Sequence, residues 1–171
     1  PADVPEFGRK IHVEASRMIQ LVNDILQLSH LDSVSETHAQ PDMETVDLLD
    51  VAKDCVERQK LNAQRSFISL TYLGESARVL GNRDQLDELC QNLCDNAIRY
   101  NRPGGKVQLI TSCTRDGHCT LTVKDNGIGI PKDAQSSVFE RFYRVDKSRS
   151  KATGGTGLGL AIVKHIAVSY T

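Results

Sequence analysis

The sequence contains no tryptophan, few other aromatic residues and no long apolar run. Aromatic side chains make up 5% of its 171 residues, so the core must come mainly from the aliphatic residues that dominate its 39% hydrophobic content. No apolar segment approaches the roughly 18 residues that a membrane-spanning helix needs, and no basic stretch leads into an apolar one as in a targeting peptide. We therefore expect a soluble protein with one domain and a short appendage.

The sequence also lacks an excess of charge and a metal-binding cysteine pattern. A net charge of -1 and a pI near 6.6 give no field to attract nucleic acid or anionic lipid, so we expect neither nucleic acid nor a membrane as a partner. The five cysteines are odd in number and include no Cys-x-x-Cys pair, which argues against a disulfide framework and a zinc site. We expect reduced thiols in a cytoplasmic protein, with core positions for Cys90, Cys94, Cys113 and Cys119.

The first part of the chain carries the pattern of one long amphipathic helix over residues 6–31. Its apolar residues recur at alternating spacings of four and three, on a face too broad for packing against the edge of one small domain. This spacing is typical of a helical bundle, so the helix needs partner helices from another chain or from sequence absent here. A helix that folds back onto the following domain is the alternative. The apolar positions are Ile11, Ala15, Met18, Val22 and Ile25, widened by Ile19, Leu21, Leu26 and Leu28.

A polar, aperiodic stretch with Pro41 predicts a linker between this helix and a domain that starts near Met43. The expected parts are the helix at 1–33, the linker at 34–43 and the domain at 44–171. Strands and helices follow there without regular alternation, which predicts an α+β fold with a mixed sheet covered by helices on one face. We expect strands at 44–46, 67–73, 78–80, 106–114 and 119–124, helices at 47–62, 83–100 and 158–169, and loop with short helical pieces at 131–151.

The predicted helix at 83–100 has one apolar and one polar face. Its polar residues fall within one arc of about 100° when successive residues turn by about 100°. A solvated outer face is the simplest interpretation, but asparagines are poor helix formers that such a face would rarely contain. Amide oxygens suit Mg²⁺, and an arginine one turn further on can bind phosphate oxygens. The polar residues are Glu88, Asn92, Asp95, Asn96 and Arg99.

Two glycine-rich blocks follow. In DNGIGIP at 125–131, Asp125 can accept a hydrogen bond from an exocyclic amine such as that of adenine, and the glycines let the backbone approach a flat base. A tight turn is the alternative. GGTGLGL at 154–160 opens a helix whose free N–H groups favour an anion, although it fits neither the P-loop nor the Rossmann pattern. A flexible loop is the alternative there.

A locally basic segment lies between these blocks and includes Arg141, Arg144, Lys147, Arg149 and Lys151. It is either solvated charge or a lid that closes over phosphates. We expect Phe139, Phe142 and Tyr143 to anchor this segment by burying their rings against the domain.

Taken in order, four blocks resemble the N, G1, F and G2 boxes of sensor histidine kinases, members of the ATPase group that includes gyrase, Hsp90 and MutL. The blocks are ELCQNLCDNAIRY at 88–100, DNGIGIP at 125–131, FERFYRVD at 139–146 and GGTGLGL at 154–160. The resemblance covers residues 46–167. It implies a two-layer α/β sandwich of the Bergerat type, with a lid over ATP and Mg²⁺. The implied activity is transfer of the γ-phosphoryl group to a histidine, followed by relay to an aspartate of a response regulator.

The resemblance also implies roles for single residues. Asn96 would coordinate Mg²⁺ with support from Asn92, and Glu88 would polarise the nucleophile. Arg99 and Arg144 would contact phosphate, Tyr100 would lie against the adenine, and Asp125 would bind its amino group. The base pocket would be shaped by Gly127, Gly129 and Ile130, and the phosphates would lie beside Gly155, Thr156, Gly157, Leu158 and Gly159.

Residues 11–32 resemble the second helix of the dimerisation and phosphoacceptor hairpin, which forms a four-helix bundle in a homodimer. The first helix, with its phosphoacceptor histidine, is expected to be missing, because none of His12, His30, His38, His118 and His165 fits that motif. The family usually continues beyond the position of Thr171 into closing strands. We therefore expect a fragment from the cytoplasmic portion of a membrane-anchored bacterial protein. An ATP hydrolase of the gyrase or MutL kind and a non-catalytic module that senses nucleotide are the alternatives.

Overall fold

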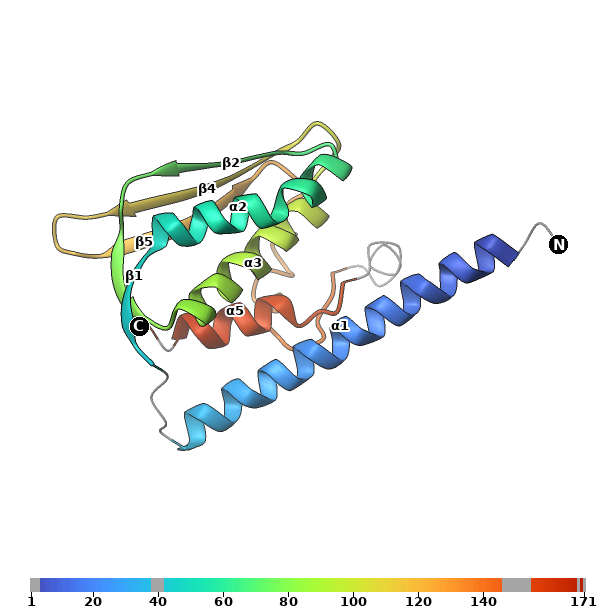
Figure 1. The fold of residues 1–171 in the computed structure, drawn as a ribbon, viewed down its shortest axis with the longest axis horizontal. Coiled ribbons are helices and arrows are strands. Elements are labelled where there is room, and N and C mark those ends of the chain that lie inside the picture. Colours follow the sequence, from blue (N-terminus) through green and yellow to red (C-terminus); the bar gives the residue numbers. More distant parts are fainter. Residues whose placement is uncertain (1–3, 38–41, 146–154, 169, 171) are drawn as a thin grey trace.

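The computed structural model describes residues 4–37, 42–145, 155–168 and 170, and it has the expected α+β class (Figure 1). A mixed sheet is covered by helices on one face, and a long N-terminal helix lies outside these two layers. The elements are α1 (Val4–Thr37), β1 (Glu44–Asp47), α2 (Leu48–Arg65), β2 (Ser69–Gly74), β3 (Arg78–Gly81), α3 (Arg83–Arg99), β4 (Lys106–Cys113), β5 (Cys119–Asp125) and α5 (Gly159–Val168).

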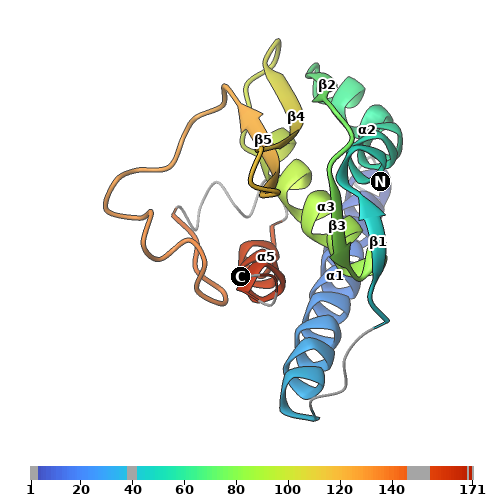
Figure 2. The ribbon, with the colours of Figure 1, turned by 90° about the vertical axis from the view of Figure 1, so that its left-hand side faces the viewer.

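Strand β4 is the centre of a three-stranded sheet of order β2-β4-β5. It runs parallel to β2 and antiparallel to β5, and alternate residues of β4, Val107, Leu109 and Thr111, are buried under the helices. Strands β1 and β3 form a separate antiparallel pair. Figure 2 shows α2 and α3 lying beside the sheet, with α5 on the far side of α3. This arrangement confirms the predicted mixed sheet and helix layer.

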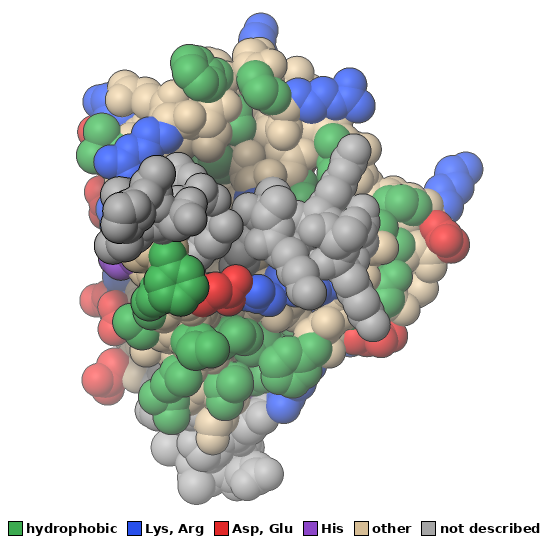
Figure 3. All heavy atoms as spheres, turned by 90° about the vertical axis from the view of Figure 1, so that its right-hand side faces the viewer, with side chains coloured by type: hydrophobic (Ala, Val, Ile, Leu, Met, Phe, Trp, Pro, Cys, Tyr) green, Lys and Arg blue, Asp and Glu red, His purple; other side chains and the backbone are tan. Residues whose placement is uncertain are grey.

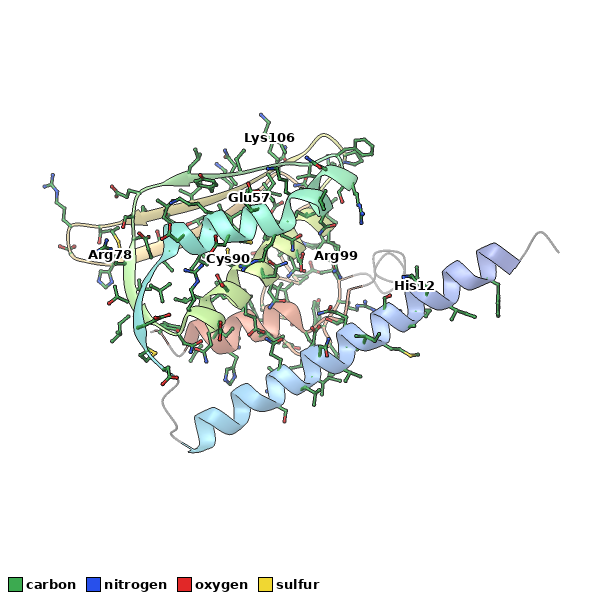
Figure 4. The ribbon with its side chains drawn as sticks, in the orientation of Figure 1. His12, Glu57, Arg78, Cys90, Arg99 and Lys106 are labelled. Carbon is green, nitrogen blue, oxygen red and sulfur yellow. A yellow bond between two sulfur atoms is a disulfide. The ribbon has the colours of Figure 1, made fainter. Side chains whose placement is uncertain are left out.

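The core lies between α2, α3 and the sheet. Cys55 of α2 and both Cys90 and Cys94 of α3 have no exposed surface, so the core positions predicted for Cys90 and Cys94 are confirmed. Figure 4 shows Cys90 on the side of α3 that faces α2. Small apolar side chains at this contact let the two helices approach closely. The contact fixes which face of α3 is left for other interactions.

Side-chain caps set the starts of both core helices. Asp47 Oδ1 accepts a hydrogen bond from the Leu49 N–H at 2.9 Å, and Asn82 Oδ1 accepts one from Gln85 N–H at 3.0 Å. Asp47 also accepts from the Ser76 hydroxyl and from the Ala77 N–H, which ties the start of α2 to the segment before β3. The Ser76 hydrogen bond is the main cause that holds the pKa of Asp47 below its usual value.

Helix α1 is longer than expected. It continues to Thr37, so the first residues of the linker expected at 34–43 are helical instead. Residues 38–41 of that linker lie outside the described part of the chain. The polar composition that suggested a linker is also compatible with a solvated helix end, because most of its residues are tolerated in a helix.

The alternative in which α1 folds back onto the domain holds for one face, and packing of α1 in a bundle stays a prediction. One narrow face packs on the domain, where Leu28 is 5% exposed beside Leu158, Ile162 and Ile166, with Leu21 packed at the margin. The other face carries exposed apolar residues, and Figure 3 shows hydrophobic side chains gathered in the lower part of the molecule, where α1 runs. This exposed stripe consists of Ile11 (56%), Met18 (64%), Ile19 (62%), Val22 (55%), Ile25 (47%) and Leu26 (63%). Within the described residues, no helix is long and apolar enough to cross a bilayer.

Two segments differ from the sequence-based expectation. Phe67 has a positive φ of 56° and is 75% exposed, so β2 starts at Ser69 rather than at residue 67. Its N–H donates to the Gln64 carbonyl at 3.0 Å, which makes Phe67 part of a turn after α2, and its carbonyl accepts the Gly104 N–H at 2.7 Å. Residues 131–145 form turns, and this described part of the 131–151 segment contains none of the expected helical pieces.

Cys113 and Cys119 form a disulfide, which corrects the expectation of reduced core thiols. The two residues face each other across the β4–β5 ladder, and both are only half-buried. This disulfide could not be predicted from the sequence, because it depends on the register of the β4–β5 hairpin. Direct opposition in an antiparallel pair brings the two Cβ atoms within reach of one bond.

We predict that the protein purified without reductant contains this disulfide. After denaturation without reductant, three of the five cysteines should react with a maleimide, because only Cys55, Cys90 and Cys94 are free. Mass spectrometry after reduction should then show five modified cysteines. Labelling of all cysteines before reduction would contradict the bond, and Cys113→Ser should leave Cys119 reactive.

Candidate functional site

The polar face of α3 meets the glycine-rich loop at Asn92. The Asn92 side-chain NH₂ donates to the Glu88 carbonyl at 3.2 Å, which directs the other side-chain atom, Oδ1, toward α5. A Cβ placed on Gly159 would lie 2.9 Å from this oxygen, so a larger residue there would push the Asn92 side chain aside. Asn96 is half-buried one turn further along the same face. The side-chain amide of Asn92 therefore lies against the start of α5.

Two guanidinium groups converge on Gly155. A Cβ at this glycine would lie 2.9 Å from Arg99 Nη1 and 3.7 Å from Arg144 Nη2, and 3.3 Å from the Tyr100 hydroxyl. Figure 4 shows Arg99 at the end of α3 that is nearest the start of α5. Like charges brought together shortly before the start of a helix would favour an anion, because the N-terminal end of a helix adds to the positive potential.

The turn after β5 lies next to Tyr100. Asp125 Oδ1 accepts a hydrogen bond from the Gly127 N–H at 2.8 Å, and the Tyr100 carbonyl accepts one from the Ile128 N–H at 3.1 Å. A Cβ on Gly127 would come within 2.5 Å of that carbonyl, so the turn requires glycine. Gly129 has a φ of 71° and open space beside it, and Ile130 is 47% exposed. Backbone and side chains of the first two blocks thus lie side by side.

The segment between the glycine blocks contacts the second block through its backbone. The Phe142 N–H donates to the Gly157 carbonyl at 2.9 Å, and a Cβ on Gly157 would lie 3.1 Å from the Phe142 backbone. The expectation that the rings of Phe139 and Phe142 anchor this segment by burial is wrong, because they are 40% and 59% exposed. Tyr143 is half-buried. The basic residues Lys147, Arg149 and Lys151 lie outside the described residues.

Three residues assigned to the site face α1 instead. Glu88 lies beside Asp24 and Gln27 of α1, Leu158 has no exposed surface and packs beside Leu28, and the Thr156 hydroxyl is hydrogen-bonded to Asp24. Sequence reasoning missed Asp24, although a carboxylate close to apolar helix positions is a detectable signal. Asp95, from the predicted polar arc, accepts a hydrogen bond from Gln59 of α2.

Burial raises the pKa of Glu88 to about 7, and the charge of Asp24 adds to this effect while a hydrogen bond with Gln27 opposes it. Glu88 Oε1 is buried without a hydrogen-bond partner among the described atoms. The carboxylate form is therefore disfavoured where α1 packs on α3.

Of two cavities, one is lined by residues of the first block and the other by none of the four blocks. One of about 390 Å³ lies between the ends of α2 and α3 and is lined partly by Asp95, Ile98 and Arg99. The other, of about 460 Å³, lies at β1 and β3 beside Asp47 and Arg83. Near Gly155, the side chains of Arg99, Tyr100 and Arg144 already occupy the space next to the loop. A nucleotide would have to displace them outward.

We predict that Glu88→Gln stabilises the protein at high pH only. The pKa of Glu88 is raised from 4.5 to about 7 in the fold, so the wild type loses stability as pH rises through that range, whereas glutamine does not titrate. After discounting for partial exposure, we expect a gain of about 1 kcal/mol at pH 8 and none near pH 4. Thermal unfolding at both pH values measures it. Glu57→Gln, at an exposed position on α2, is the control, and an equal gain at both pH values would contradict the explanation.

Comparison with known proteins adds an independent result. The family described as histidine kinase-, DNA gyrase B-, and HSP90-like ATPases matches residues 81–170. The sensor-like histidine kinase SenX3 of Mycolicibacterium smegmatis is 42% identical over 99% of this chain and 44% of the relative. The sensor histidine kinase RppB of Synechocystis is 41% identical over 97% of this chain and 37% of the relative. The chain thus spans under half the length of these curated relatives.

Solved structures resemble the fold. The mycobacterial sensor histidine kinase MprB aligns with a TM-score of 0.64 and 34% identity, over 75% of this chain and 80% of that one. Full-length ShkA in complex with AMPPNP aligns with a TM-score of 0.78 over 99% of this chain and 34% of that one. At 24% identity, this second likeness is one of fold, and it includes helix α1.

Proposed function

The chain belongs to the sensor histidine kinases of the histidine kinase-, DNA gyrase B- and HSP90-like ATPase family, and we propose that it binds Mg-ATP and phosphorylates a histidine. In sensor histidine kinases of two-component systems, this part of the chain is the ATP-binding catalytic domain. The histidine would belong to a dimerisation helix, and an aspartate of a response regulator would receive the phosphoryl group next.

The observation that carries this proposal is the convergence of Arg99 and Arg144 on Gly155. Phosphate oxygens placed at the start of α5 would accept hydrogen bonds from both guanidinium groups and from free backbone N–H groups. At the other end of the site, Asp125 is exposed beside Gly127 and Tyr100, where it can accept a hydrogen bond from an adenine amino group. Tyr100 contacts both ends of the site, because its hydroxyl lies near Gly155 and its carbonyl accepts the Ile128 N–H.

The donor set also fits Mg²⁺. Asn92 is held by its NH₂ group on the Glu88 carbonyl, so its Oδ1 is the atom turned toward the glycine-rich loop. Asn92 and Asn96 would hold the ion through hard amide oxygens, and bound Mg²⁺ would neutralise charge on the phosphates. Arg99 and Arg144 would orient the terminal phosphoryl group and stabilise the charge that develops during transfer.

The exposed stripe of α1 supports assembly into a homodimer. Apolar residues at this spacing, 47–64% exposed, favour burial against other helices, as in a four-helix bundle with a second copy. The relay partner would be a receiver domain. An ATP hydrolase with Glu88 as the base for water is the weaker candidate, because Glu88 packs toward Gln27 and Asp24 of α1.

We predict that Arg99→Ala and Arg144→Ala each weaken Mg-ATP binding about tenfold, since a charge-assisted hydrogen bond to phosphate contributes about 1.5 kcal/mol or more. Isothermal titration calorimetry with ATP and with adenosine tests this, because adenosine affinity should not change. Arg102→Ala removes an exposed arginine outside the cluster and should bind normally. Equal losses in all three variants would contradict a specific phosphate site.

We also predict that Asn96→Ala abolishes phosphotransfer. When a histidine-bearing dimerisation helix is supplied in trans, the wild type should label it from radioactive ATP, and the variant should not, because a metal ligand is lost. Asn62→Ala, on the exposed side of α2, is the matched control. Full activity of Asn96→Ala would exclude the metal role, and ATP turnover without phosphohistidine in the wild type would favour the hydrolase.

A further inference from the structure

Asp24 is a buried carboxylate at the contact between α1 and the domain. It is 6% exposed, and each of its oxygens accepts a hydrogen bond. Gln20 Nε2 of the same helix donates to Oδ1 at 2.7 Å, and the Thr156 hydroxyl donates to Oδ2 at 2.6 Å. A buried charge needs such partners, because burial without them costs several kcal/mol. Of these two donors, Gln20 belongs to α1 itself and Thr156 belongs to the domain.

Thr156 belongs to the glycine-rich loop that carries the phosphate site. Its neighbour Gly155 lies against Arg99 and Arg144, and its neighbour Gly157 lies against Phe142. The Thr156 oxygen also accepts a hydrogen bond from the Leu158 N–H at 3.3 Å, so the side chain is tied to the start of α5. The hydroxyl therefore connects α1 to the segment whose backbone would surround an anion.

A hydroxyl group has a single proton to donate. While the Thr156 proton is given to Asp24, a phosphate oxygen at the loop cannot receive it. The negative charge of Asp24 acts in the same direction, because it lies one hydrogen bond away from a loop that would hold a polyanion and is shielded from solvent by its burial. Docking of α1 and binding of phosphate thus place opposite demands on one side chain.

The docked contact combines a favourable and an unfavourable interaction. Leu28 packs with Leu158, Ile162 and Ile166, which favours docking. When Glu88 is ionised, its burial and the nearby charge of Asp24 are unfavourable, which opposes docking. An anionic ligand that binds next to Thr156 can therefore shift the balance between docked and released α1.

We propose that Asp24 and a nucleotide phosphate compete for the Thr156 hydroxyl, so that nucleotide binding and docking of α1 on the domain weaken each other. This inference rests on the proposed function, because it needs an anionic ligand at the glycine-rich loop. Linkage requires the effect to be reciprocal: release of α1 raises nucleotide affinity by the same factor by which nucleotide loosens α1. Asp24 is then a positioning residue that acts through Thr156.

The test compares Asp24→Asn with the wild type on the full chain, using a non-hydrolysable ATP analogue with Mg²⁺. The amide keeps the size of the side chain and removes its charge, so we expect nucleotide to bind at least about fivefold more tightly. Leu28→Ala, which weakens docking without changing Asp24, should also bind more tightly. Glu14→Gln removes an exposed acid from the same helix and should leave affinity unchanged. Calorimetry measures all four affinities.

Hydrogen exchange of residues 20–28 provides the second readout. Saturating nucleotide should increase exchange there in the wild type, and the increase should be smaller in Asp24→Asn, because its neutral amide holds the Thr156 hydroxyl less strongly than the carboxylate does. Equal or weaker binding by Asp24→Asn, or exchange that nucleotide does not change, would overturn the competition while leaving the nucleotide site intact. Absence of nucleotide binding in every variant would instead overturn the proposed function and the competition with it.

Discussion

The contact between α2 and α3 determines how the rest of the molecule is arranged. Cys90 and Cys94 lie fully buried against α2 and the sheet, which leaves Asn92 facing the start of α5 and Arg99 facing the loop before it. A helix has one rotational setting once such a face is packed. The candidate site therefore depends on core thiols that never touch a ligand. A larger residue at either cysteine would turn or displace α3 and separate its amides from the glycine-rich loop.

Charges of opposite sign lie on the two sides of that loop. Arg99 and Arg144 approach Gly155 from α3 and from the segment before the loop, whereas Asp24 approaches Thr156 from α1. Glu88 adds a second carboxyl group on the α1 side. The glycine-rich loop lies between the two sets of charged side chains, and glycines occupy the positions where these side chains come closest to its backbone. Its conformation responds to small changes in either set of charges, because glycine restricts the backbone least.

The sequence was sufficient to predict most elements and the polar face of α3. Alternation and caps are local signals, and Asp47 and Asn82 start their helices where such signals place them. The positions of Glu88, Leu158 and Thr156 could not be predicted from those signals, because they depend on the packing of α1 across α5. The bond between Cys113 and Cys119 likewise depends on a register that is set by distant strands. The rings of Phe139 and Phe142 show the same limit, since hydrophobicity alone predicted their burial.

Helix α1 presents separate surfaces to the domain and to solvent. Asp24 and Leu28 lie about 40° apart around the helix axis, while Met18, Val22 and Ile25 lie about 100–160° away from Asp24. In the proposed homodimer, a subunit could thus detach its catalytic domain without loosening the helix pairing between the two copies. In a dimer built on the exposed stripe, one domain could stay docked while the other is released, so the two subunits could change their docking state independently.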